Sequence, residues 1–187
     1  RGKFRGGWDE MRENRFRRQQ EMGLAAESWK LSEGESRAYS WANANQDFED
    51  HRMAVYAAMI DSVDQNIGRL LKTLSQTGHD EDTLILFLSD NGGCAEEPGG
   101  RDPEKRNPGP GDDYVAVGPA WGWAQNAPFR RYKSWLNEGG ITTPMIAWWP
   151  NVIPQGTINR DVAHIIDFLP TLVELGGGDY PKQFKGI

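Results

Sequence analysis

A run of apolar residues ends abruptly at polar residues near the middle of the chain. Residues 84–88 are five consecutive large apolar side chains, and Ser89, Asp90, Asn91 and two glycines follow them. A run this short between turn signals predicts a β-strand that is buried on both faces of an α/β sheet. Asp90 and Asn91 then lie at the carboxyl end of the strand, the edge where open α/β sheets bind ligands.

The polar pair after this strand has two interpretations. A carboxylate oxygen and an amide oxygen are hard donors that suit Ca²⁺ or Mg²⁺, so Asp90 and Asn91 are candidate metal ligands. The sequence Asp-Asn-Gly is also common in ordinary turns, which need no metal. On either interpretation, Gly92 and Gly93 let the backbone turn sharply beside the pair.

Two helices are predicted before this strand. Residues 50–77 place apolar side chains at three- and four-residue steps, and Gly78 follows as a stop signal. The apolar face is expected to pack on the sheet, with Gly68 at a close approach to a neighbouring element. Helix and strand together form half of a βαβ-type unit. The earlier helix, residues 9–22, carries arginines among glutamates, which favours a solvated face over a nucleic-acid surface.

Two stretches are expected to be loops. Residues 24–46 lose the helical period and are predicted to cross the surface. Residues 93–128 also have little periodicity, and a loop of this length is usually functional or mobile. Near its end, Trp121 and Trp123 are either a wall for a ring-bearing substrate or buried anchors that pin the loop.

The C-terminal third contains two further predicted elements. Residues 144–150 are apolar between two prolines, which predicts a second short strand. Residues 162–175 predict a closing helix, with a break at or near Pro170.

Composition limits the classes of function. The net charge of −6 argues against a nucleic-acid-binding surface, which normally carries a basic face. No segment approaches about 18 consecutive apolar residues, so no membrane span is expected. The single cysteine, Cys94, cannot form an internal disulfide. The 187 residues suit one domain, and the start without methionine suggests a portion of a longer protein.

Four segments of the sequence together resemble the arylsulfatases, in the order and spacing of that family. The resemblance begins at Gly6-Gly7-Trp8-Asp9 and covers almost the whole chain. The four segments are residues 56–68; residues 83–92; Pro128-Phe129-Arg130-Arg131-Tyr132-Lys133 with Glu138-Gly139-Gly140-Ile141 and Thr143-Pro144; and Asp167-Phe168-Leu169-Pro170-Thr171-Leu172.

This resemblance implies an α/β fold similar to alkaline phosphatase, in which a large mixed sheet lies between helices and the active site is at the strand ends. It implies a calcium ion held in part by Asp90 and Asn91, and a nucleophile that is a formylglycine hydrate made from cysteine or serine. Lys133 matches the lysine that holds a sulfate oxygen, although without the motif it would be interpreted as a solvated cation. The partner is then a sulfate ester, either a small molecule or a sulfated glycan, and a periplasmic or secreted location is favoured.

Some motifs of the family do not occur in this sequence. The nucleophile lies in Cys-x-Pro-x-Arg or Ser-x-Pro-x-Arg, and the residues after Cys94 do not match. His51, His79 and His164 match none of the family's histidines. We therefore expect residues 1–187 to be the middle and C-terminal portion of one sulfatase catalytic domain. The nucleophile-bearing segment and the extreme C-terminal part are expected to lie outside it, so that the chain alone is inactive.

Two alternative functions stay open. One is a phosphodiesterase or phosphonate monoester hydrolase of the same superfamily, which would use the same kind of metal site. A non-catalytic relative would instead bind sulfated glycans through Lys133 and the tryptophans. Presence of the nucleophile motif in the complete protein favours an enzyme, and its replacement favours a binding protein. The sequence does not indicate the oligomeric state.

Overall fold

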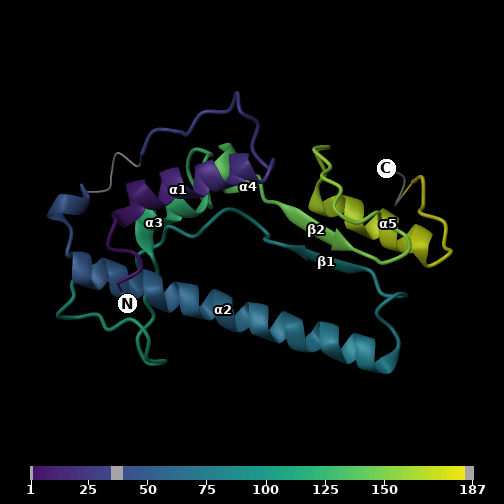
Figure 1. Cartoon of the computed structure of the whole chain (residues 1–187), viewed down its shortest axis with the longest axis horizontal. Coiled ribbons are helices and arrows are strands. Elements are labelled where there is room, and N and C mark those ends of the chain that lie inside the picture. Colours follow the sequence, from purple (N-terminus) through teal and green to yellow (C-terminus); the bar gives the residue numbers. More distant parts are fainter. Residues whose placement is uncertain (1, 35–39, 184–187) are drawn as a thin grey trace. The chain divides into compact units, whose positions relative to one another are not determined.

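The computed structural model describes residues 2–34 and 40–183 (Figure 1). Part of the predicted loop over residues 24–46 therefore lies outside the described residues. The chain divides into two units, Arg1–Gln155 and Gly156–Ile187. The first unit contains the candidate site.

A tryptophan-rich core lies where helix α1 (Gly7–Glu21) packs on helix α3 (Gly118–Gln125). Trp8 and Trp121 meet edge to face with ring centroids 5.6 Å apart, and the ring of Trp41, at the start of the 3₁₀ helix η1 (Trp41–Asn43), contacts both. Edge-to-face pairs add to the free energy gained from burying these large rings. Helix α3 falls inside the segment predicted to be a loop, because its eight residues are too few to show a period.

The polar character predicted for α1 holds for most of its surface but not for Arg12. The Arg12 side chain is only 6% exposed, and its guanidinium donates a hydrogen bond to the Ser32 carbonyl oxygen. Asp9 supplies a second contact at 3.4 Å from the Arg12 guanidinium. The solvated-face interpretation therefore does not hold for Arg12, which joins α1 to the segment that follows it.

Helix α2 (Gln46–Thr77) is the longest element of the first unit (Figure 1). Its N-terminus is capped by Asn45, whose side-chain oxygen accepts a hydrogen bond from the Phe48 amide at 3.1 Å. Gly78 ends it in the left-handed conformation, with a φ of 70°. The helix starts at Gln46, four residues earlier than predicted, because Gln46, Asp47 and Glu49 are polar and do not extend the apolar period.

The predicted packing of α2 on the sheet was wrong for the described residues. Ile60, Val63 and Leu70 are 51%, 47% and 66% exposed, and a side chain at Gly68 would face open space. The helix is much longer than the strands of the sheet. A helix of 32 residues is about 48 Å long, whereas strands of four residues span only about 14 Å. Only the N-terminal turns of α2 are buried, around Phe48 and Met53.

Both predicted strands form, and they pair with each other. Strand β1 (Ile85–Leu88) runs antiparallel to β2 (Met145–Trp148), with Ile85 opposite Trp148 and Leu88 opposite Met145. The described residues contain this two-stranded sheet alone, so neither the large mixed sheet nor a parallel βαβ partner is present among them. The prediction of burial on both faces was also wrong, since Phe87 is 49% exposed. Two short strands leave both sheet faces open.

Two short helices complete the second unit. The 3₁₀ helix η2 (Ile165–Asp167) is capped by His164, whose Nδ1 accepts from the Ile166 amide while its own amide donates to the Asp167 carboxylate at 2.7 Å. Helix α5 (Phe168–Leu175) follows directly. Pro170 lies in the first turn of α5 and does not break it, because the amide that proline lacks has no helical partner there.

None of the helices in the described ranges combines the length and the apolar character that crossing a membrane requires.

Candidate functional site

The site is built at the end of β1, where the chain leaves the sheet. Asp90 is exposed and Asn91 is half-buried. Two hydrogen bonds hold the backbone at this point. The Thr143 hydroxyl donates to the Ser89 carbonyl oxygen at 2.9 Å, and the Ser89 hydroxyl donates to the Asn91 carbonyl oxygen at 2.9 Å. The start of β2 therefore fixes the place where Asp90 and Asn91 leave the sheet.

Glycines at this position are required by close contact with another segment. The Gly92 amide donates to the Gly140 carbonyl oxygen in the short helix α4 (Glu138–Ile141), and a Cβ on Gly92 would lie 1.8 Å from the Gly139 carbonyl oxygen. A Cβ on Gly139 would in turn lie 2.2 Å from the Arg131 carbonyl oxygen. The sequence predicted only a sharp turn at Gly92. The structure shows three backbone segments in contact, which explains the Glu138-Gly139-Gly140 motif sterically.

Lys133 lies beside the end of β1 although 40 or more residues separate it from that strand. Its backbone amide donates to the Gly93 carbonyl oxygen at 3.2 Å. Its ammonium lies 3.3 Å from a carboxylate oxygen of Glu96, and the two side chains are 41% and 59% exposed. The hydrogen bond and charge of Glu96 raise the pKa of Lys133, and the charges of Cys94 and Asp90 add to the effect. Lys133 is therefore a fully charged cation at neutral pH.

One side-chain amide connects the parts of this site. The Asn126 side-chain oxygen accepts from the Gly93 amide at 2.8 Å. Its side-chain nitrogen donates to the carbonyl oxygens of Gly122 and Arg131, at 2.8 and 3.1 Å. Asn126 thus joins the end of β1, helix α3 and the turn before Lys133. Sequence reasoning missed this residue, because a single asparagine before Ala-Pro carries no pattern.

The tryptophans proposed as a substrate wall are core residues. Trp121 is 0% exposed and donates its indole N–H to Glu49 at 2.9 Å, and Trp123 is 3% exposed and donates to the Ser32 hydroxyl at 3.1 Å. Neither ring has a free face, so the substrate-wall interpretation was wrong and the buried-anchor alternative is confirmed. Trp135, two residues after Lys133 in the sequence, is 40% exposed, and the Arg131 guanidinium lies 4.2 Å from its ring centroid.

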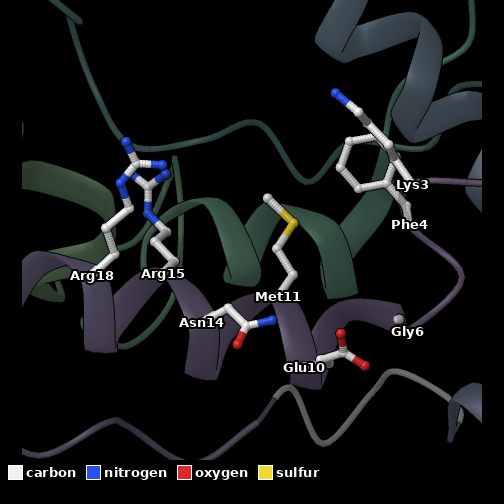
Figure 2. Close-up of a pocket in the computed structure, with 9 residues that line it drawn as sticks. Lys3, Phe4, Gly6, Glu10, Met11, Asn14, Arg15 and Arg18 are labelled. Carbon is white, nitrogen blue, oxygen red and sulfur yellow. The ribbon is translucent and has the colours of Figure 1, made fainter.

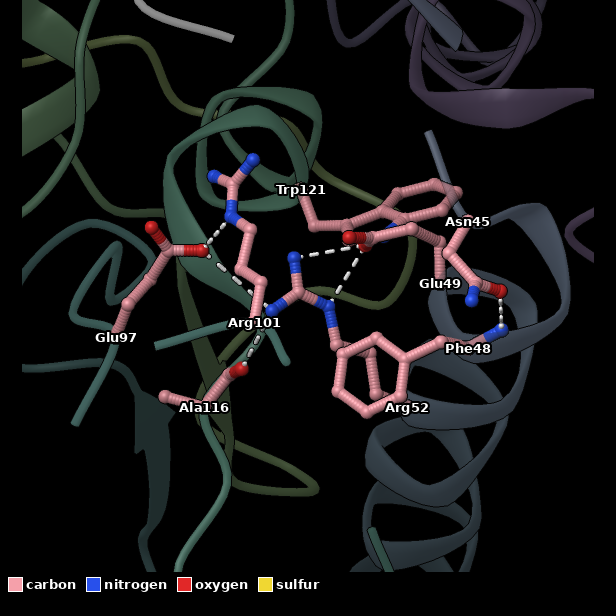
Figure 3. A network of polar contacts seen from close by, with 8 residues as sticks. All are labelled: Asn45, Phe48, Glu49, Arg52, Glu97, Arg101, Ala116 and Trp121. Carbon is pink, nitrogen blue, oxygen red and sulfur yellow. Dashed lines mark hydrogen bonds and ion pairs between the residues drawn. The ribbon is translucent and has the colours of Figure 1, made fainter. Parts of the chain in front are cut away.

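A buried polar network anchors the loop beyond the site to α2 (Figure 3). Glu49 accepts hydrogen bonds from Arg52 at 2.7 Å and from the Trp121 indole. Arg52 also donates to the Ala116 carbonyl oxygen at 3.2 Å and lies 3.5 Å from Glu97. Burial raises the pKa of the Glu49 carboxyl, and the charge of Arg52 offsets part of that rise. Because Glu97 is anchored in this way, the neighbouring Glu96 is held near Lys133.

A separate pocket of about 360 Å³ lies along α1 (Figure 2). Phe4 and Met11 form its apolar part, and Arg15 and Arg18 extend side by side from α1 at one end. Asp90, Asn91 and Lys133 do not line it. The pocket is therefore not the site that the sequence predicted.

The residues at the end of β1 fit calcium by donor type. The Asp90 carboxylate and the Asn91 amide are hard oxygen donors, whereas Ca²⁺ takes about six to eight oxygens. Within the ranges that the structure describes, no group of three or more His, Cys, Asp or Glu side chains could hold a metal ion. Asp90 and Asn91 can therefore supply part of a calcium site, and most of its ligands would have to come from other groups.

Comparison with known proteins places the chain in a family. The sequence model of the sulfatase family matches residues 11–178, so this chain belongs to the sulfatases, as the resemblance predicted. The sulfatase domain has an α/β fold of the alkaline-phosphatase type. The described residues contribute helices and a two-stranded sheet to such a fold.

The relatives in question are sulfatases of bacteria and eukaryotes. An uncharacterized sulfatase of Schizosaccharomyces pombe is 31% identical over the whole of this chain and 37% of its own length. An arylsulfatase of Klebsiella aerogenes is 32% identical over 97% of this chain and 42% of its own length. A dog N-acetylgalactosamine-6-sulfatase is 29% identical over 65% of this chain and 19% of its own length. The chain thus spans less than half the length of these relatives.

Proposed function

We propose that the protein to which this chain belongs hydrolyses sulfate monoesters, and that this chain contributes part of the active site. The observation that carries the proposal is the backbone hydrogen bond from Lys133 to Gly93, at 3.2 Å. It holds the backbone of Lys133, whose side chain carries the charge, beside the end of β1, where the two candidate calcium ligands, Asp90 and Asn91, leave the sheet. The sulfatase names of the relatives support the same reaction.

The role proposed for Lys133 is to neutralise charge on the sulfate group. A sulfate monoester spreads its negative charge over the sulfate oxygens, and a fixed cation near them stabilises the transition state more than water does. An ammonium suits this role because it is a compact point charge with three donors. Family membership supports the position, since Lys133 lies within the matched residues.

Asp90 and Asn91 are proposed to hold part of a calcium ion. When bound, such an ion would polarise a sulfate oxygen and lower the pKa of a nucleophilic hydroxyl. The bonds from Thr143 and Ser89 hold the backbone from which the two ligands extend. A preformed backbone lowers the entropy lost on binding.

The nucleophile is not proposed to be a residue of this sequence. No Cys-x-Pro-x-Arg or Ser-x-Pro-x-Arg occurs in it, and Cys94 is followed by Ala95, Glu96 and Glu97. A formylglycine elsewhere in the protein is the nucleophile that sulfatase membership supports. The substrate is a sulfate ester, either a small molecule or a sulfated glycan.

The test is a pair of lysine variants in the complete protein. We expect Lys133→Ala to lower kcat/KM for an aryl sulfate by about 10²–10³-fold, as the loss of a preorganised charge partner does. Lys105→Ala is the matched control, because Lys105 is 78% exposed and pairs with Asp102 in the loop. Thermal unfolding of both variants separates a lost contact from misfolding. If the two variants were equally active, the role proposed for Lys133 would have to be abandoned.

A further inference from the structure

Glu96 is the acid that contacts the proposed sulfate-binding lysine. Its carboxylate lies 3.3 Å from the Lys133 ammonium, and both side chains are substantially exposed. An exposed ion pair of this kind contributes little to stability. A contribution to fold stability therefore does not explain why an acidic residue contacts the Lys133 ammonium.

The pair forms because both backbones are anchored. Lys133 is bound through its amide to Gly93, and Gly93 is bound through its own amide to Asn126. On the other side of Glu96, Glu97 is paired with the buried Arg52 and with Arg101. The three residues between Gly93 and Glu97 are thus held at both ends. The Glu96 side chain can reach Lys133 and can also rotate away into solvent without moving the backbone.

A carboxylate and a sulfate monoester present similar chemistry to an ammonium. Each is an anion of charge −1 at neutral pH, and each offers oxygens that accept hydrogen bonds from N–H donors. The Lys133 ammonium has three donors, and one of them is taken by the Glu96 carboxylate at 3.3 Å. Glu96 in its observed conformation therefore occupies the place that a sulfate oxygen would take.

We propose that Glu96 is an internal competitor for the sulfate group: it pairs with Lys133 when substrate is absent, and the substrate must displace it. This inference rests on the function proposed above. It has a consequence for specificity, because the displaced carboxylate stays tethered beside the site. A substrate with a second anionic group near its sulfate would meet that carboxylate and be repelled. The site thus disfavours sulfate esters that carry a second anionic group close to the sulfate.

The test is Glu96→Gln in the complete protein, with Glu104→Gln as the control. Both changes remove one negative charge from the same loop, but Glu104 is exposed and forms no ion pair with the described residues. Kinetics with 4-nitrophenyl sulfate give KM and kcat, and inorganic sulfate as a competitive inhibitor gives its inhibition constant. We expect Glu96→Gln to lower both KM and the sulfate inhibition constant by about two- to fivefold, the range of an exposed ion pair. We expect kcat to stay within about twofold, and Glu104→Gln to change none of the three.

Other outcomes separate the two proposals. A lower kcat with unchanged KM in Glu96→Gln would mean that Glu96 positions Lys133, and it would overturn the competitor role. Unchanged KM and sulfate inhibition would also overturn it. If Glu96 acts through Lys133, its effect should vanish in the Lys133→Ala background, as a double-mutant cycle reports. If Lys133→Ala itself had no effect on kcat/KM, the role of Lys133 in the proposed function would be rejected, whatever the result for Glu96→Gln.

Discussion

The amide of Gly92 donates a hydrogen bond to the carbonyl oxygen of Gly140, at 3.0 Å. This bond joins the end of β1 to α4, and the two backbones lie too close for a side chain on Gly92. The candidate metal ligands directly precede Gly92, and Lys133 lies in the turn that leads to α4. The geometry of the site therefore depends on a contact between glycines.

Gly92→Ala is expected to damage both stability and activity. The added Cβ would lie 1.8 Å from the Gly139 carbonyl oxygen, and backbone cannot yield as a flexible side chain does. We expect a loss of about 1–3 kcal/mol in the free energy of unfolding, together with a large loss of sulfatase activity. Denaturant unfolding and turnover of an aryl sulfate measure the two effects.

Gly68→Ala is the matched control for that substitution. Gly68 lies in the middle of α2, and its Cβ would meet no atom within 4 Å. Alanine favours the helix over glycine, so we expect a gain of about 0.5–1 kcal/mol. A loss of stability on Gly68→Ala would show that another segment covers this face of α2 in the complete protein.

Asp90→Ala is expected to remove calcium as well as activity. Asp90 is the only carboxylate of the proposed ligand pair. Changing a residue that merely supports a metal ligand typically weakens metal binding by about 10–100-fold. Loss of Asp90, a direct ligand, should therefore weaken calcium binding by more than that. Bound calcium is measured by elemental analysis or calorimetry on the complete protein. Asp112→Ala, at an exposed aspartate in the long loop, is the control. Retention of calcium by Asp90→Ala would exclude Asp90 as a ligand.

Glu49→Ala is expected to be among the most destabilising changes in the first unit. It leaves the Arg52 guanidinium, whose side chain is 2% exposed, without its main partner. Breaking a buried ion pair on one side typically lowers stability by about 3–5 kcal/mol. Because Glu97 lies 3.5 Å from Arg52, the lower end of this range is expected. Glu13→Ala, on the exposed face of α1, should change stability by less than about 0.5 kcal/mol.

Asp50 makes stability depend on pH in the acid range. Burial acts to raise its pKa, but hydrogen bonds from the Gly2 and Phe4 amides, at 2.6 and 2.8 Å, outweigh burial, and the pKa is lowered. A lowered pKa in the folded state contributes stability above the unfolded-state pKa of about 3.9. That contribution is lost as the pH falls through the folded-state pKa.

The measurement is the difference in Tm between the native protein and Asp50→Asn as a function of pH. The native protein should have the higher Tm at pH 7, and the difference should shrink as the pH falls below about 4. A difference that stays constant down to pH 2 would mean that the charge of Asp50 does not hold the N-terminal segment.

The sequence by itself determined the elements that depend on neighbouring residues. The apolar period and Gly78 place the end of α2 where the structure has it, and β1 lies within the run of apolar residues. The family was also readable, because four short motifs in order are specific even when each is weak alone. Asp90 and Asn91 could be singled out because they are adjacent in sequence and come just after the apolar run and Ser89.

Only the tertiary structure decided how distant segments meet. The sequence around Trp121 is compatible with either a surface ring or a core ring. Its burial follows from contacts with Trp8 and Glu49, more than 70 residues away. The pairing of Lys133 with Glu96 likewise joins segments 37 residues apart. Such contacts leave no period and no local signal, because the chain between them can take many paths. The energetic gain from burial and backbone hydrogen bonding selects one path only when the whole unit folds.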